Sequence, residues 1–142
     1  MWKLISAFIV PGKPFGKQRP RHMRNGHTYT PKETIEYENL VKLFYSQSEH
    51  PKEPTDKPIQ MVIQADFPIP TSWSKKKKRE AEEYQPFCCT KPDSDNIIKG
   101  LSDALLGIAY KDDSQIVTLH CEKFYGTTPQ VIVNLYEWVE ES

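Results

Sequence analysis

The sequence predicts an α+β fold, in which helices pack against a mixed, largely antiparallel sheet within a single domain. Segments with the composition of strands recur along the chain, and segments with helical periodicity and capping signals lie between them. The length of 142 residues is typical of one domain. No internal repeat or low-complexity linker divides the chain, so we expect one domain over residues 1–142.

Four segments rich in apolar and β-branched residues are predicted to be strands. The first is a strand rather than a signal peptide, because it stops at Pro11-Gly12 and lacks a long apolar core. The last two are separated by Gly126-Thr127-Thr128-Pro129, a turn sequence that predicts a β-hairpin between them. The four strands are residues 3–10, 59–67, 115–125 and 130–138.

Three helices are predicted from capping signals and apolar periodicity. Thr30 is the predicted N-cap of the first, followed by Pro31 and by Glu33 as the acid of a capping box. Ser74 is the predicted N-cap of the second, which contains the run Lys75 to Arg79. Such a run is more often a solvated helix face than a DNA contact. The helices are residues 31–47, 74–83 and 93–107.

The net charge is zero, but the charges are unevenly distributed. Residues 1–32 contain no acid, which leaves the rest of the chain with seven more acids than bases. This distribution predicts one phosphate-facing surface and a separate region rich in carboxylates. Four side chains of the basic arm in residues 1–32 are candidates for phosphate contacts, although a solvated loop explains them equally well. They are Lys17, Arg19, Arg21 and Arg24.

Composition argues against several classes of protein. No apolar run approaches the roughly 18 residues of a membrane-spanning helix. Three cysteines without a C-x-x-C motif make a poor disulfide framework and disfavour structural zinc, so a reducing cytoplasm is expected. His22 and His27 lack partner ligands, which favours surface or phosphate contacts over a metal site.

Residues 91–115 form the segment in which we expect a metal site. Pro92 disfavours helix for the residue before it, so the helix begins just afterwards. Asp93 and Asp95 stand at that start, and two carboxylates so close repel each other unless a cation lies between them. Oxygen ligands of this kind suit Mg²⁺ or Mn²⁺ rather than zinc. The alternative is that these acids only cap the helix and complement its dipole.

Other polar residues could extend this site. Lys99 and Asp103 share a helix face with Asp95, at intervals of four residues. The pair Asp112-Asp113 follows between the helix and the next strand, where aspartates alone favour a turn. The spacing permits the loop and the sheet to return Asp113 to the start of the helix.

Two segments together resemble the signature of the RusA family of Holliday-junction resolvases. They are K-P-D-S-D-N-I-I-K-G-L-S-D-A-L at 91–105 and Y-K-D-D-S-Q-I-V at 110–117. The sequence G-K-P-F-G-K-Q-R-P-R at 12–21, Y-T-P at 29–31 and S-W-S-K-K-K at 72–77 resemble the longer-armed branch of that family. Because founding-type members have a different arm, their DNA contacts do not transfer to this chain.

The resemblance implies a function and a role for specific residues. Asp93, Asp95 and Asp113 correspond to metal-binding carboxylates, and Lys99 corresponds to the catalytic lysine. The cofactor is expected to be Mg²⁺, with Mn²⁺ as a substitute. The implied protein is a homodimer that makes paired, symmetric nicks in a four-way DNA junction during recombination and repair. The implied setting is the cytoplasm, in a bacterial or prophage context.

Three other functions remain open at this point. The same carboxylates could serve a general or flap-type structure-selective nuclease. A non-catalytic DNA-binding module would use the acids only as caps and turns. A small protein–protein adaptor would use the acidic C-terminus, Glu137 to Glu141, but that leaves the basic arm and the acidic segment without a role.

Overall fold

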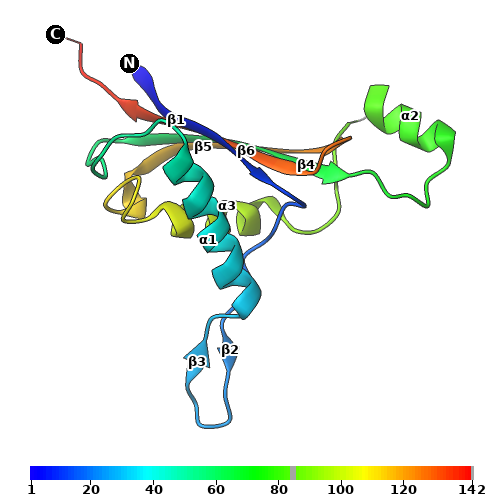
Figure 1. Cartoon of the computed structure of the whole chain (residues 1–142), viewed down its shortest axis with the longest axis horizontal. Coiled ribbons are helices and arrows are strands. Elements are labelled where there is room, and N and C mark those ends of the chain that lie inside the picture. The colour runs from blue at the N-terminus through cyan, green and yellow to red at the C-terminus, as the bar shows by residue number, and fades with distance from the viewer. Residues whose placement is uncertain (84–85, 142) are drawn as a thin grey trace.

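The computed structural model describes residues 1–83 and 86–141. Within these residues, three α-helices and a mixed four-stranded sheet form one α+β domain, as the sequence predicts. Figure 1 shows α1 and α3 on one side of the sheet, α2 beyond one end of it, and a small hairpin projecting from the body. The two ends of the chain lie close together at the end of the sheet opposite α2.

The strands of the main sheet lie in the order β1-β6-β4-β5. Strand β6 pairs antiparallel with both β1 and β4, whereas β4 and β5 are parallel. The predicted mixed, largely antiparallel sheet is therefore confirmed. Its strands are β1 (Trp2–Pro11), β4 (Ile59–Pro68), β5 (Ile116–Gly126) and β6 (Gln130–Trp138).

The predicted hairpin between the last two strands is wrong, because β4 lies between β5 and β6. From Ile59 to Phe67, every second side chain of β4 is at most 2% exposed. A strand this apolar buries most surface in a central position, with a neighbour on each edge. The turn after β5 therefore passes the end of β4, where a Cβ on Gly126 would lie 3.4 Å from the Cβ of Asp66.

The helices begin within one residue of their predicted starts. The backbone N–H of Lys77 donates to the Ser74 hydroxyl at 3.1 Å, which confirms Ser74 as the N-cap of α2. The predicted N-cap Thr30 is wrong. Pro31 takes that position with an extended backbone, φ −56° and ψ 145°, so the helix begins one residue later. The helices are α1 (Lys32–Gln47), α2 (Lys75–Glu83) and α3 (Ser94–Leu105).

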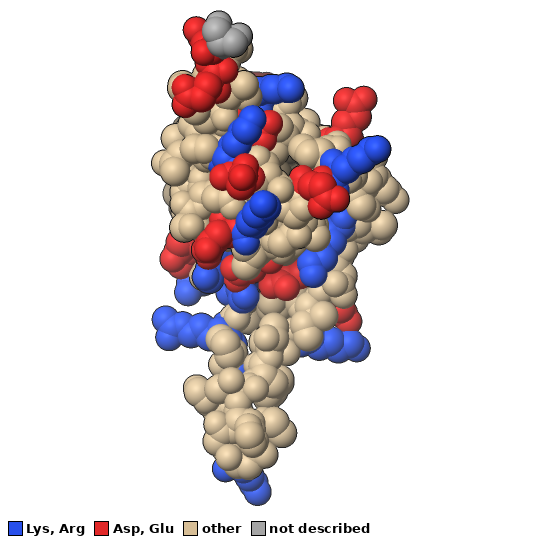
Figure 2. All heavy atoms as spheres, turned by 90° about the vertical axis from the view of Figure 1, so that its left-hand side faces the viewer, with Lys and Arg blue, Asp and Glu red and all other residues tan. Residues whose placement is uncertain are grey.

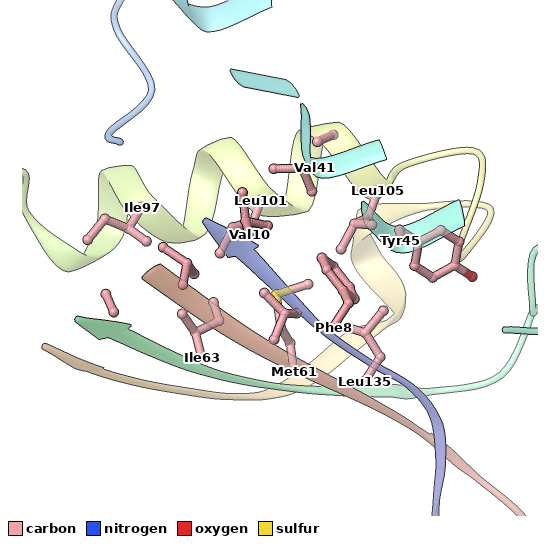
Figure 3. Close-up of a cluster of buried hydrophobic side chains, with 14 of the residues drawn as sticks. Phe8, Val10, Val41, Tyr45, Met61, Ile63, Ile97, Leu101, Leu105 and Leu135 are labelled. Atoms are coloured by element: carbon pink, nitrogen blue, oxygen red, sulfur yellow. The ribbon is translucent and has the colours of Figure 1, made fainter. Parts of the chain in front are cut away.

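The core lies between the sheet and the pair α1 and α3 (Figure 3). Ile97, Leu101 and Leu105 follow one another at intervals of four and are at most 1% exposed, so one face of α3 lies on the sheet. In Figure 3, Ile97 lies above Ile63 and Leu105 lies toward Leu135. The packing of α3 thus fixes which end of the sheet each of its termini faces.

The basic arm contains a short hairpin. Strand β2 (Arg21–His22) pairs antiparallel with β3 (Thr28–Tyr29). At its tip the backbone N–H of Gly26 donates to the carbonyl of Met23 at 3.0 Å, and the φ of +84° at Gly26 is one that glycine adopts without strain. The hairpin extends away from the body of the protein (Figure 1). Its side chains are therefore presented at a distance from the sheet.

Candidate active site

Asp93 and Asp95 lie at the start of α3. Asp93 occupies the N-cap position with an extended backbone, φ −68° and ψ 153°, but its side chain makes no capping hydrogen bond. Asp95 lies in the first turn, and both residues are exposed. Capping therefore does not account for the carboxylate of Asp93. Both acids can accept a ligand from solvent.

The base of the basic arm packs against this helix start. The backbone N–H of Lys17 donates to the carbonyl of Asn96 at 3.0 Å. A Cβ on Gly16 would lie 2.6 Å from the Cβ of Pro92, so this close approach requires glycine. Between the two segments lies a groove of about 510 Å³, which we call the α3 groove. Its lining includes Lys13, Lys17, Lys91, Asp93 and Asn96.

Lys17 is held within the protein by two carboxylates. Its ammonium contacts Asp103 of α3 and lies 3.5 Å from Oε1 of Glu38 of α1. Burial lowers the pKa of Lys17, but the hydrogen bond and charge of Asp103, together with Glu38, outweigh this effect and raise the pKa above its ordinary value. Lys17 thus ties the arm to both helices.

Lys99 lies one turn beyond Asp95 on the exposed side of α3. Its Nζ is 3.8 Å from Oδ1 of Asp103, and its side chain is 60% exposed. An exposed ion pair of this length stabilises the fold very little. The ammonium of Lys99 is therefore available to a bound anion near the start of α3.

The loop before β5 is fixed by Asp112 and Gln115. The Asp112 carboxylate accepts the N–H of Ser114 at 3.0 Å, while Oε1 of Gln115 accepts the N–H of Asp112 at 2.8 Å. This reciprocal capping box encloses the short 3₁₀ turn η1 (Asp113–Gln115). The hydrogen bonds from Ser114 and the contact with Asp113 lower the pKa of Asp112. Asp112 therefore stabilises this turn, and Asp113 beside it is exposed.

Asp113 lies near the end of α3, away from its start. It comes just before β5, whose first residue, Ile116, pairs with Ile59. Two residues along β4, Met61 pairs with Leu135 of β6. Figure 3 shows Leu135 beneath the C-terminal end of α3. The register of the sheet therefore places Asp113 at this end.

The surroundings of Tyr110 agree with this placement. Its hydroxyl donates to the carbonyl of Ser102 at 2.5 Å, in the second half of α3. Burial raises the pKa of Tyr110, and the charges of Asp103 and Asp113 raise it further. Asp113 thus lies within electrostatic range of the C-terminal half of the helix. Ten residues of α-helix span about 15 Å, which is the axial separation of Asp93 and Asp103.

The structure thus brings Asp93 and Asp95 together and leaves Asp113 apart from them. Across residues 1–83 and 86–141, no three His, Cys, Asp or Glu side chains form a group that could hold a metal ion. In this conformation one chain offers two neighbouring carboxylates at the start of α3 and a third near its end.

The arginines of the arm are placed differently from Lys17. Arg19, Arg21 and Arg24 are all exposed, and Arg21 lies in β2 of the projecting hairpin. Figure 2 shows basic side chains at the tip of the arm and where the arm meets the body. These arginines can therefore reach a surface that the body of the domain does not.

Several residues of the site were not singled out from the sequence. Gly16 and Asn96 form the contact between the arm and α3, and Glu38 shares Lys17 with Asp103. None of these contacts has a local signal, because each joins segments distant in sequence. The D-x-x-Q pattern of Asp112 to Gln115 is the exception, since it is a recognisable capping box.

The chain matches the family described as "Endodeoxyribonuclease RusA" over residues 11–136. It belongs to the RusA family. The match contains the basic arm, the α3 groove and η1, so every element of the site described above lies inside it. The chain is also 41% identical over 135 residues to "Uncharacterized protein YqaN" of Bacillus subtilis strain 168, covering 92% of this chain and 94% of that protein.

Membership of the RusA family identifies the chain as an endodeoxyribonuclease, and the family acts on branched DNA. The family is metal-dependent. In the part of the chain that the structure describes, no helix is long and apolar enough to cross a membrane.

Proposed function

We propose that this RusA-family protein is a Mg²⁺-dependent endodeoxyribonuclease that resolves four-way junctions by paired, symmetric nicks. The observation that carries the proposal is the start of α3. There the exposed Asp93 lines a groove together with Lys13 and Lys91, and Asp95 is exposed two residues further along the helix. Acids that can hold a cation, beside bases that attract phosphate, are the arrangement that phosphodiester hydrolysis requires. We expect it to act in the cytoplasm, in a bacterial or prophage setting.

The donor atoms suit a hard divalent cation. Asp93 and Asp95 both offer carboxylate oxygens, and the carboxylate of Asp93 makes no capping hydrogen bond. Oxygen ligands of this kind favour Mg²⁺, with Mn²⁺ as a substitute. When bound, such an ion supplies charge neutralisation at the phosphate and a more acidic water. Lys99, one turn along α3, places a positive charge where the phosphate gains negative charge during the reaction. Asp113 is the proposed third carboxylate.

Asp113 would reach this site from a second subunit. Within one chain it lies toward the other end of α3, so a group of three needs either a rearrangement of the loop or a partner. When two copies of an element pair across a twofold axis, the start of one copy lies beside the end of the other. Such an axis can therefore bring one subunit's Asp113 to Asp93 and Asp95 of the partner subunit. The proposed homodimer then has two equal sites, as paired nicks require.

The outer edge of β5 is the proposed dimer contact. Apart from a bridge between Phe124 and Phe87, no strand pairs with this edge in the described residues. Its first half exposes Val117 by 60% and Leu119 by 45%, and no charged residue lies between Ile116 and Leu119. A free, uncharged edge favours pairing with another strand. Antiparallel pairing of two β5 edges moves the partner's Asp113 toward the segment that leads into Asp93.

The function is tested by cleavage of a labelled four-way junction and of a linear duplex, each with and without Mg²⁺. Paired nicks in the junction that need Mg²⁺ are expected, with little cutting of the duplex. Equal cutting of both substrates would make the protein a general nuclease. Tight junction binding without any cutting would make it a DNA-binding module, and either result would overturn the proposal.

A further inference from the structure

Two further hollows lie beyond the α3 groove, around Trp73. One has a volume of about 330 Å³ and the other about 460 Å³, and both are lined by Trp73, Thr90 and Tyr125. We call the two together the aromatic groove. Its smaller part also includes Lys77 and Phe87.

The aromatic groove adjoins the candidate active site. Lys13 lines both the larger of the two hollows and the α3 groove, and Thr90 directly precedes Lys91 of the α3 groove. Lys13 therefore joins the lining of the α3 groove to that of the larger hollow, and Trp73 joins the larger hollow to the smaller one. A ligand that occupies the active site can therefore continue into the aromatic groove.

The walls of this groove offer aromatic ring surfaces. Trp73 meets Tyr125 edge to face, with ring centroids 4.9 Å apart. Phe87 stacks on Phe124 at 5.3 Å and is still 54% exposed. Because about half of the Phe87 side chain is exposed to solvent, its burial contributes little to the stability of the fold. Ring faces of this kind stack well on other planar groups.

The charge around these rings is mainly positive. Nζ of Lys77 lies 4.2 Å from the centroid of the Trp73 ring, and Lys77 belongs to the run Lys75 to Arg79 that opens α2. Lys13 lies at the junction with the α3 groove. Glu80 is the one acid among the residues lining the aromatic groove. Lysines beside aromatic rings favour a ligand that combines planar groups with anions.

We propose that the aromatic groove binds unpaired nucleotides of single-stranded DNA, with bases stacking on Trp73 and Phe87 and phosphates facing Lys13 and Lys77. The inference rests on the proposed function, because cleavage of a junction at the active site would place a DNA strand that can extend into the groove. Duplex DNA keeps its base faces stacked inside the helix, whereas bases beside a branch point can be exposed. Stacking on aromatic side chains is how proteins bind single strands without regard to sequence.

The test is binding of a fluorescently labelled oligo(dT) to the full chain in EDTA, measured by anisotropy. Stacking on one ring is worth enough that Phe87→Ala and Trp73→Ala should each weaken binding by about tenfold or more. Trp73→Phe keeps a ring and should retain most of the affinity. Trp138→Phe is the matched control, because Trp138 packs on Trp2 at the far end of the sheet. Thermal melting of each variant checks that it is folded.

The EDTA condition separates this proposal from the nuclease assignment, because binding then needs neither metal nor cleavage. Oligo(dT) binding that depends on Phe87 and Trp73 supports the groove, even in a protein that cuts no junction. Unchanged affinity in folded Phe87→Ala and Trp73→Ala variants would overturn it, even if junctions are cut normally. Self-association that Phe87→Ala abolishes, without an effect on oligo(dT), would assign the surface to a second copy and also overturn it.

Discussion

Asp112 and Asp113 are neighbours with the same side chain, yet the structure gives them different surroundings. The carboxylate of Asp112 accepts the N–H of Ser114, and Gln115 completes the capping box around the turn. Asp113 is exposed at the surface. The neighbouring acids are therefore separable by experiment, one through stability and the other through activity.

We predict that Asp112→Ala lowers the free energy of unfolding, because the turn loses its cap. Asp113→Asn should leave stability nearly unchanged and abolish junction cleavage. Urea unfolding and cleavage of a labelled junction measure the two effects. A stable Asp112→Ala protein together with an active Asp113→Asn protein would contradict the division of roles.

Tyr37 predicts a dependence of stability on alkaline pH. Burial raises the pKa of Tyr37 to about 12, and its ring stacks on Phe15 at the base of the arm, 5.1 Å away. The folded protein keeps this proton to a higher pH than the unfolded chain does, whose tyrosine titrates near 10.0. The contribution is therefore complete below pH 10 and is lost as the pH rises toward 12, about 2 to 3 kcal/mol in all.

Urea unfolding between pH 9 and pH 11.5 measures this effect, with Tyr37→Phe as the comparison. The variant should lose stability less steeply above pH 10. Part of the slope should persist in the variant, because burial also raises the pKa of Tyr45 and Tyr110. Identical slopes in the two proteins would show that Tyr37 is not buried as described.

Among the elements, the basic arm separates charges that hold the fold from charges that face outward. Lys17 is matched by Asp103 and Glu38, whereas Arg19 and Arg21 are exposed. Seven basic residues and no acid in residues 1–32 predicted a phosphate-facing surface, but composition alone does not tell which charges are already paired.

We predict that each of Arg19→Gln, Arg21→Gln and Arg24→Gln weakens junction binding and reduces the slope of log K against log salt by about 0.9. Fluorescence anisotropy at several salt concentrations, in Ca²⁺ or EDTA, gives these slopes. Lys17→Gln is the comparison, and it should lower the melting temperature with a smaller change of slope. Slopes unaltered by all three arginine substitutions would remove the arm from the DNA contact.

The elements themselves were largely predictable, because helices and strands follow from local patterns. Ser74 shows this, since one capping serine marks the start of α2. The order of strands was not predictable in the same way. The turn at Gly126 is a local hairpin signal, but the burial of β4 along its whole length decides that it lies between β5 and β6. Pairing partners depend on burial in the complete sheet.

At the scale of the whole molecule, the same distinction applies to the site. Asp93 and Asp95 are close because they are neighbours on one helix, and the sequence alone predicted this. The position of Asp113 depends on where β5 enters the sheet, which spacing does not reveal. The proposed dimer explains how Asp113 could act at the same site as Asp93 and Asp95, although it lies apart from them within one chain.

Mixing two inactive variants tests whether the site is shared between subunits. In a mixed dimer of Asp93→Asn and Asp113→Asn, one of the two shared sites keeps all its native carboxylates, so single nicks should reappear. A mixture of Asp93→Asn and Asp95→Asn is the control, because both of its shared sites lack a carboxylate. No restoration in the first mixture would place the whole site within one chain.

The central claim is that the acids at the start of α3 perform the cleavage. Its most direct test is the rate of Mg²⁺-dependent junction cutting by Asp95→Asn, with junction affinity measured separately in EDTA. Glu53→Gln, which also removes an exposed acid, is the matched control. We predict that Asp95→Asn lowers the rate by about 100-fold or more while affinity is retained. A folded Asp95→Asn protein that cuts junctions at the rate of the native chain would contradict the account.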